Sequence, residues 1–230
     1  MALGKPNRPQ GKALNLKLRL KSKDGTYLLP PVFEISQKQA DGSYPVVGTE
    51  TDVSGDAVSL SVRTGEFEGR PVRSFNIGLR DAKAGEVYFV DIGLSSGIGR
   101  SLANSILNLK TRKNVQIGTY ARKGTDKKTY GAASIREDGS DETVKWKYDD
   151  KSTPALPPAR VYEGKGGVKE RDFTAQEEFL YARLEELSKT FKQSHSAQDD
   201  TGTAAPADTT TATDTTTPAG VTPGAEDVPF

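Results

Sequence analysis

The pattern that most restricts the fold of this chain is a series of short segments in which apolar and polar residues alternate. In the first of them, Leu14, Leu16, Leu18 and Leu20 alternate with polar residues, which is the period of a half-buried β-strand. Further strands are predicted at 27–36, 45–49, 57–63, 71–80, 86–92, 114–122, 128–136 and 143–148. Dipeptides typical of turns, such as Asp24-Gly25 and Asp138-Gly139, separate the segments. The sequence therefore predicts a mainly β fold.

One segment within this series has helical spacing instead. Ile98, Leu102, Ile106 and Leu109 recur at intervals of three or four residues within 97–110. Strands, then one helix, then a final hairpin is the order of elements in an OB-fold barrel. We therefore expect an OB-fold barrel with one helix before the last hairpin.

A second helix is predicted from about residue 175 to 192. Thr174 and Glu177 have the spacing of a capping box at its start. Its apolar stripe consists of Phe179 or Leu180 together with Leu184, Leu187 and Phe191. Such a stripe either packs on the barrel or forms a contact with a second chain or a replication partner. A connector rich in Pro and Gly precedes this helix and is expected to lie along the barrel as an extended strap.

Composition divides the chain into five parts. Residues 1–12, rich in Gly, Pro, Lys and Arg, are predicted to be a flexible basic arm. Residues 13–163 form the predicted OB-fold domain with its strap, and residues 164–192 form the helical segment. Residues 193–225 are mostly Thr, Ala, Pro, Gly and Asp, so a disordered linker is expected there. Residues 226–230 form a separate tip.

The formal net charge of +1 conceals an uneven distribution. Residues 1–163 carry 26 Lys and Arg against 19 Asp and Glu. Residues 193–230 carry 6 acidic residues and no Lys or Arg. A basic body with an acidic tail favours a body that binds a polyanion and a tail that binds other proteins.

Several classes of protein are disfavoured by composition. The chain has no cysteine, which excludes disulfides and thiolate metal sites, and its single histidine is His195. No metal site and no cofactor is predicted. The longest apolar runs are too short to span a bilayer, and the first residues lack the apolar core of a signal peptide. A soluble, cytoplasmic protein without membrane association is expected.

An esterase is the rival interpretation from the enzyme class. Residues 93–97 match the G-x-S-x-G nucleophile motif and lie between a predicted strand and a predicted helix. The motif needs a histidine base held in place, and His195 lies in the predicted linker. We therefore predict no enzymatic activity and interpret Gly97 and Gly99 as a tight turn into the helix.

The last five residues carry the most specific motif. Glu226, Asp227, Val228, Pro229 and Phe230 resemble the C-terminal tip of bacterial single-stranded-DNA-binding proteins (SSBs), an acidic run followed by Ile-Pro-Phe. This chain has Val in place of Ile and only two adjacent acids. A terminal phenylalanine ring fills an apolar pocket, and its α-carboxylate pairs with a cation at the rim. The resemblance implies that the tip recruits replication, recombination or repair proteins.

The predicted barrel contains a second resemblance. Residues 114–122, 123–127 and 128–135 look like the fourth strand, the following loop and the fifth strand of an SSB-type OB-fold. This similarity covers about 50 residues, from Glu86 to Arg136. Together with the tip, it implies an SSB encoded by a bacteriophage and acting in the host cytoplasm. Single OB-folds often bind in several copies, so a homo-oligomer is compatible with this interpretation.

An OB groove for DNA needs cations for phosphates and flat rings for bases. Alternation in 114–122 predicts Val115, Ile117 and Thr119 in the core and Tyr120 and Arg122 on the opposite face. Alternation also selects Lys128, Tyr130, Arg136, Arg80 and Trp146, and Lys123 and Lys127 add charge in the loop after 114–122. Arg73 has the parity of the apolar Phe75 and is included as a residue at the end of its strand. The full set of DNA-binding candidates is Tyr120, Arg122, Lys123, Lys127, Lys128, Tyr130, Arg136, Arg80, Arg73 and Trp146.

The function expected from the sequence is binding and protection of single-stranded DNA with little sequence preference. Two alternatives stay open: an accessory protein for recombination or annealing, and an OB-fold adaptor that binds only proteins. The acidic tail is also expected to compete with DNA for the groove, so that deleting residues 195–230 strengthens DNA binding at low salt.

Overall fold

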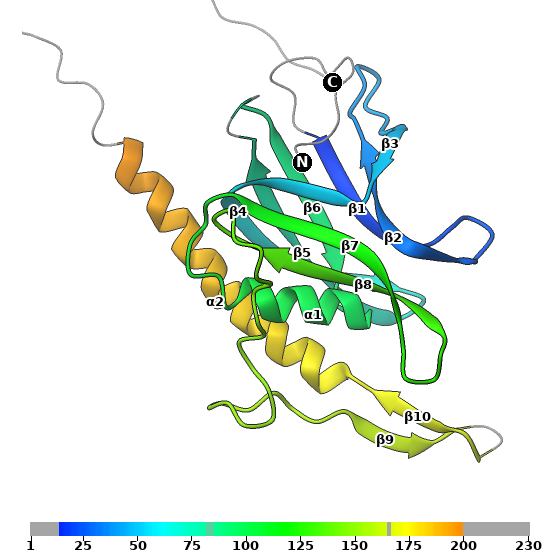
Figure 1. The fold of residues 1–230 in the computed structure, drawn as a ribbon. Helices are drawn as coiled ribbons and strands as arrows, with labels where there is room; N and C mark the ends of the chain where they lie inside the picture. The colour runs from blue at the N-terminus through cyan, green and yellow to red at the C-terminus, as the bar shows by residue number, and fades with distance from the viewer. Residues whose placement is uncertain (1–13, 82, 84, 165–166, 200–230) are drawn as a thin grey trace, which may run out of the picture.

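The computed structural model describes residues 14–81, 83, 85–164 and 167–199 (Figure 1). The described elements are β1 (Leu14–Lys21), β2 (Tyr27–Ser36), β3 (Val46–Glu50), β4 (Asp52–Phe67), β5 (Arg70–Arg80), β6 (Val87–Gly93), α1 (Gly97–Ile106), β7 (Val115–Lys123), β8 (Thr129–Arg136), β9 (Arg160–Glu163), β10 (Lys169–Asp172) and α2 (Thr174–Asp199). The mainly β prediction is confirmed. The predicted basic arm at 1–12, the predicted linker from residue 200 onward and the tip at 226–230 lie outside the described residues, whereas residues 193–199 of the predicted linker are helical.

Eight of the strands form one mixed sheet in the order β3-β2-β1-β6-β5-β4-β7-β8. All neighbouring pairs are antiparallel except β1 and β6, which are parallel. The sheet is not closed, because β3 and β8 are its two ends and have no ladder between them. The place beside β6 is occupied by β1, and the final hairpin β7–β8 joins the rest of the sheet through a ladder with β4.

The long strand β4 links the β7–β8 hairpin to the rest of the sheet, because it pairs with a different strand along each of its two edges. Its first residues, Asp52 to Gly55, pair with β7, and its later residues pair with β5. A Cβ at Gly55 would lie 2.6 Å from the carbonyl oxygen of Arg80, so only glycine fits where β4 passes between its two partners.

Although the sheet is open, β2 crosses over the β7–β8 hairpin. The hydroxyl of Thr119 donates to the carbonyl oxygen of Pro31 at 2.5 Å. At Gly131 of β8, a Cβ would lie 2.7 Å from Cγ of Pro31, so this glycine allows the two segments to touch. The two contacts bring the middle of β2 against β7 and β8 without a backbone ladder.

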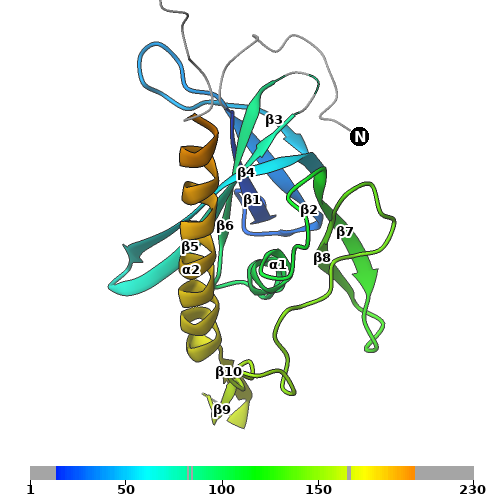
Figure 2. The same ribbon diagram turned by 90° about the vertical axis from the view of Figure 1, so that its left-hand side faces the viewer.

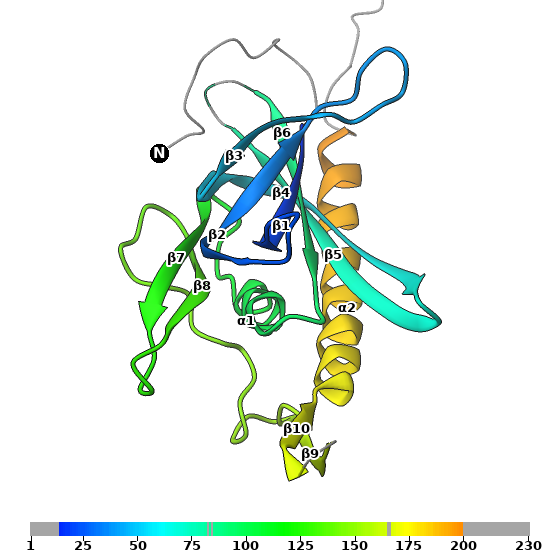
Figure 3. The same ribbon diagram turned by 90° about the vertical axis from the view of Figure 1, so that its right-hand side faces the viewer.

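The core lies between the sheet and the two helices (Figures 2 and 3). The predicted core residues Val115, Ile117 and Thr119 are buried, and so are the second half of β5 and alternate residues of β6. Helix α2 packs on β4, β5 and α1 with Leu180, Leu184 and Phe191 buried. Packing on the sheet, one of the two expectations for this helix, is therefore confirmed.

Helix α1 ends at Ile106, four residues before the predicted limit. The amides of Asn108 and Leu109 donate to carbonyls three residues back, as in a tightened final turn. The carboxylate of Glu137 accepts the amides of Lys110 and Thr111 and so holds the chain after the helix.

The strand predicted at 143–148 is wrong. The amide of Val144 donates to the carbonyl of Ile135, but the next backbone groups bond to α1 rather than to a strand. The side chain of Asn104 accepts the Tyr148 amide at 2.9 Å and donates to its carbonyl at 2.7 Å. The segment is therefore a coil that covers α1.

The start of α2 also differs from the prediction. Both the amide and the hydroxyl of Thr174 donate to the carboxylate of Asp172, and the Glu177 side chain bonds to Arg100 instead of forming a capping box. The helix continues to Asp199, beyond the expected boundary at residue 192. The connector before it is not a plain strap, since it ends in the two-stranded β9–β10 hairpin that projects from the body (Figure 1). Neither helix, over the residues described, has the length and apolar character needed to cross a membrane.

Candidate nucleic-acid interface

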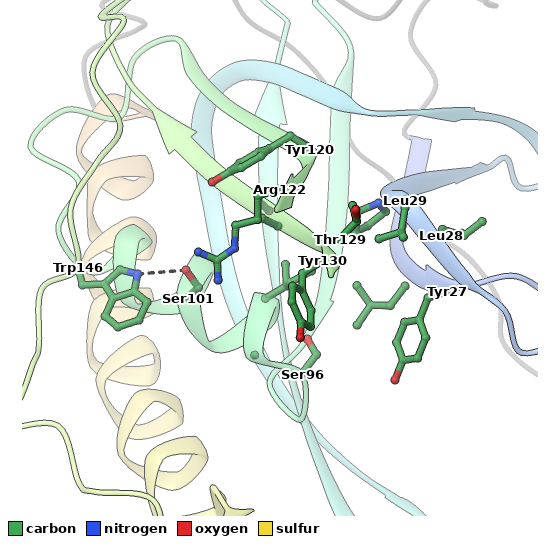
Figure 4. A pocket seen from close by; sticks show the side chains of 17 residues that line it. Tyr27, Leu28, Leu29, Ser96, Ser101, Tyr120, Arg122, Thr129, Tyr130 and Trp146 are labelled. Carbon is green, nitrogen blue, oxygen red and sulfur yellow. Dashed lines mark hydrogen bonds between the residues drawn. The ribbon is translucent and has the colours of Figure 1, made fainter. Parts of the chain in front are cut away.

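A groove of about 990 Å³ opens where β2, α1 and the β7–β8 hairpin meet (Figure 4). Its floor is apolar because Leu20, Leu29, Pro31 and Ile98 contribute aliphatic carbon. The complete lining is Leu20, Tyr27, Leu28, Leu29, Pro31, Ser96, Gly97, Ile98, Ser101, Tyr120, Arg122, Thr129, Tyr130, Gly131, Ala132, Ala133 and Trp146. The groove therefore combines an apolar floor with four aromatic residues and one cation.

Four of the predicted DNA-binding residues meet at this groove. Tyr120 and Arg122 lie on β7, Tyr130 lies opposite on β8, and Trp146 comes from the coil after β8. Arg122 and Tyr130 are direct cross-strand partners in the hairpin ladder. All three aromatic residues are exposed rather than packed in the core, which leaves their rings available to a ligand. Figure 4 shows the guanidinium of Arg122 among these rings.

Trp146 is fixed although it is exposed. Its Nε1 donates to Oγ of Ser101 on α1 at 3.0 Å, while 55% of the residue stays accessible to solvent. Because the only polar atom of the indole is satisfied by the protein, the ring can offer its apolar faces to a ligand.

The loop that joins β7 to β8 adds positive charge beside the groove. Lys123, Lys127 and Lys128 are exposed there, although none of them lines the groove itself. Lys127 has a φ of 64°, a left-handed conformation that turns the loop tightly. The one acidic residue of the loop is Asp126, which accepts the hydroxyl of Tyr130. This hydrogen bond is the main cause that raises the pKa of Tyr130 above its ordinary value.

Three other candidate cations lie away from the groove. Arg73 is mostly buried beneath α2 and pairs with Glu178 at 3.0 Å. Arg80 is exposed at the end of β5, and Arg136 is exposed at the far end of β8, opposite Gln116. None of the three lines the groove, so we leave them out of the candidate interface.

Helix α2 engages a second set of arginines. Arg100 donates to Glu177 at 3.3 Å and lies 4.0 Å above the ring of Phe173. Arg112 lies 3.7 Å above the ring of Phe191. Burial lowers the pKa of Arg100 and raises the pKa of Glu177, while their mutual attraction opposes both shifts. These arginines hold α2 on the body, so their charge is used within the fold.

The residues that sequence reasoning missed come from β1, β2 and α1. Tyr27 is the most exposed ring of the groove, and Lys21 Nζ lies 4.5 Å from its centroid. Lys21 and Tyr27 flank the Asp24-Gly25 turn, in the same way that Arg122 and Tyr130 flank the loop after β7. The sequence could have indicated Tyr27 through this repeated pattern, in which a cation and a tyrosine lie on either side of a turn.

The G-x-S-x-G segment forms the turn into α1, as expected. The hydroxyl of Ser96 accepts the amide of Gly99 at 2.9 Å and caps the helix. A Cβ at Gly99 would lie 1.8 Å from the carbonyl oxygen of Gly93, which explains the glycine at this position. Within the described residues, no group of three or more His, Asp or Glu is placed to hold a metal ion.

No known protein family, no curated protein and no solved structure matches this chain.

Proposed function

We propose that this chain binds single-stranded DNA in the groove between β2, α1 and the β7–β8 hairpin. The observation that carries the proposal is the meeting of Tyr120, Tyr130 and Trp146 with Arg122 around one apolar groove. Exposed rings stack on bases of any sequence, and a cation among them contacts phosphate. Duplex DNA hides its base faces, so this chemistry favours the single strand.

The order of elements from β4 to β8 supports an OB-type arrangement for this part of the chain. Three antiparallel strands, β4 to β6, precede α1, and a hairpin follows it, with β4 paired to both β5 and β7. In OB-folds the loop between the fourth and fifth strands contributes to oligonucleotide binding. The corresponding loop here carries Lys123, Lys127 and Lys128. The added strands β1, β2 and β3 make this unit part of a larger sheet.

The tail extends the proposal to protein partners. The resemblance of Glu226–Phe230 to an SSB tip supports recruitment of replication, recombination or repair proteins to the bound strand. The probe for this is a purified protein that binds the tips of bacterial SSBs. We expect this protein to bind the full chain but not the chain that lacks Phe230. The two chains should have the same affinity for an oligonucleotide. Equal binding of the probe to the chain without Phe230 would refute the role of the tip.

The direct test is a titration with labelled oligo-dT and with a matched duplex, followed by anisotropy at two salt concentrations. We expect salt-dependent binding to the single strand and much weaker binding to the duplex. Tyr120→Ala should weaken binding roughly 5-fold to 150-fold, the equivalent of one lost stacking contact. Tyr44→Ala is the matched control, because Tyr44 is similarly exposed but lies outside the groove. Absence of binding to either ligand would favour the adaptor that binds only proteins.

A further inference from the structure

We propose that Asp126 is a positioning residue, which holds the ring of Tyr130 in the orientation that receives a base before the ligand arrives. The inference rests on the proposed function, since it concerns the same groove. It assigns a purpose to the one carboxylate in a loop whose other charged residues are lysines.

The carboxylate of Asp126 joins the loop backbone to the ring. Its Oδ1 accepts the amide of Lys128 at 3.1 Å, and its Oδ2 accepts the hydroxyl of Tyr130. The loop is itself closed by the amide of Gly124, which donates to the carbonyl of Lys128 at 2.8 Å. The amide of Lys127 donates back to the carbonyl of Gly124 at 3.1 Å. The phenol is therefore tied to a loop whose own backbone is already ordered.

Gly124 lies close to both members of the pair. A Cβ at this position would lie 2.6 Å from Cε2 of Tyr130 and 2.8 Å from Oδ1 of Asp126. The glycine thus leaves the space in which the ring and the carboxylate lie together against the loop. Tyr130 nevertheless remains 44% exposed, so the tether restrains the ring without covering it.

Electrostatics alone gives no reason for an acid at this place. A carboxylate beside a groove that binds phosphate repels the ligand and weakens binding. Ordering a side chain at an interface also weakens binding, roughly 2-fold to 10-fold for one side chain. A ring that is already ordered before binding avoids this loss of affinity. The gain offsets the repulsion between the Asp126 carboxylate and the phosphates.

The β9–β10 hairpin provides the same pairing outside the groove. There the hydroxyl of Tyr162 donates to Oε2 of Glu170 at 2.8 Å, and Tyr162 is 45% exposed. In both pairs the carboxylate is the main cause that raises the pKa of the tyrosine. Tyr162 is therefore a matched control for removal of a tethered hydroxyl.

The experiment measures the affinity of full-length chains for labelled oligo-dT across a series of salt concentrations. Tyr130→Phe keeps the ring and every charge, and removes only the tether. We expect its affinity to fall roughly 2-fold to 10-fold, with an unchanged slope of log affinity against log salt. Tyr162→Phe should leave the affinity unchanged. In the background of Asp126→Ala, where the tether is already lost, Tyr130→Phe should cause no further loss.

Two results would overturn the inference while leaving the proposed function intact. One is a Tyr130→Phe chain that binds like the wild type although Tyr130→Ala binds weakly. The other is an equal loss from Tyr130→Phe with and without Asp126. Absorbance titration of the phenol provides an independent check, because Asp126→Ala should lower the pKa of Tyr130, and no change would contradict the tether. Failure of the wild-type chain to bind oligo-dT would instead overturn the proposed function, and the inference with it.

Discussion

Trp146 and Ser101 are joined across two segments that lie 45 residues apart, since the indole Nε1 donates to the serine Oγ at 3.0 Å. The bond ties the coil after β8 to helix α1 and sets an exposed indole at the rim of the groove. Because this is the single tryptophan of the chain, its fluorescence reports on the groove alone.

Binding of oligo-dT should therefore change the fluorescence of Trp146, and Trp146→Leu should weaken binding roughly 5-fold to 150-fold through loss of one stacking contact. Ser101→Ala keeps the ring but frees it, so a smaller loss is expected. Anisotropy with labelled oligonucleotide measures both variants. A Trp146→Leu chain with wild-type affinity would show that bases do not stack on the indole.

Arg122 and Arg136 lie on the same hairpin, but only Arg122 lines the groove. If Arg122 contacts one phosphate, Arg122→Ala should reduce the slope of log affinity against log salt by about 0.7. Arg136→Ala removes the same charge at the far end of β8 and should leave that slope unchanged. Equal effects of the two substitutions would indicate a diffuse electrostatic contribution rather than a contact in the groove.

Removal of residues 200–230 should strengthen binding to oligo-dT at low salt. The segment carries five acidic residues and no Lys or Arg, so we expect it to compete with the phosphates for the cations of the body. At high salt, where such competition is screened, the truncated and full-length chains should bind alike. The truncation starts after α2, which keeps the described fold intact. Equal affinities at low salt would disprove competition by the tail.

Leu184→Ala should lower the free energy of unfolding by about 2–5 kcal/mol, because this side chain is fully buried between α2 and the sheet. Glu185→Ala, on the exposed side of the same helix, should change it by less than about 0.5 kcal/mol. Urea unfolding followed by circular dichroism measures both. A mild effect of Leu184→Ala would mean that α2 is only loosely attached to the body.

The start of α2 should depend on pH through Asp172. Hydrogen bonds from the hydroxyl and the amide of Thr174 lower the pKa of this carboxyl below its ordinary value of 3.8. Its stabilising effect is therefore complete above pH 3.8 and disappears as the pH falls through the lower pKa of the folded state. Unfolding experiments over this acidic range should show a steeper loss of stability for the wild type than for Asp172→Asn. Parallel curves for the two chains would contradict the prediction.

The positions of most strands could be predicted from the sequence because one face of each is buried. In β7, for example, Val115, Ile117 and Thr119 are buried in the alternation that the sequence displays. The same reasoning failed at 143–148, where Val144 and Trp146 alternate without forming a strand. Asn104 takes the backbone bonds of Tyr148 there, and a contact between residues 44 positions apart has no local signature.

The site was predictable to the extent that it lies on one hairpin. Tyr120, Arg122 and Tyr130 were found from the alternation of β7 and β8, whereas Tyr27 belongs to a strand whose approach to β8 depends on Pro31 and Gly131. The sequence pattern gave no reason to exclude Arg73 as a DNA-binding residue, because its partner Glu178 lies 105 residues away. The sequence does not reveal whether a charged residue is exposed or which residue it pairs with.

The β7–β8 hairpin is buried at one end and exposed at the other. Val115 and Ile117 are fully covered, whereas the hairpin is exposed from Tyr120 to Tyr130, apart from a half-buried glycine in the loop. Amide hydrogen exchange should therefore be slow in the first half of β7, near the limit set by global unfolding, and fast beyond Tyr120. Fast exchange there needs only brief local openings of exposed amides, while the ladder and the loop hydrogen bonds keep the outer half in register. One hairpin thus supplies both a buried anchor in the core and a solvent-facing wall that carries the rings and the cation of the groove.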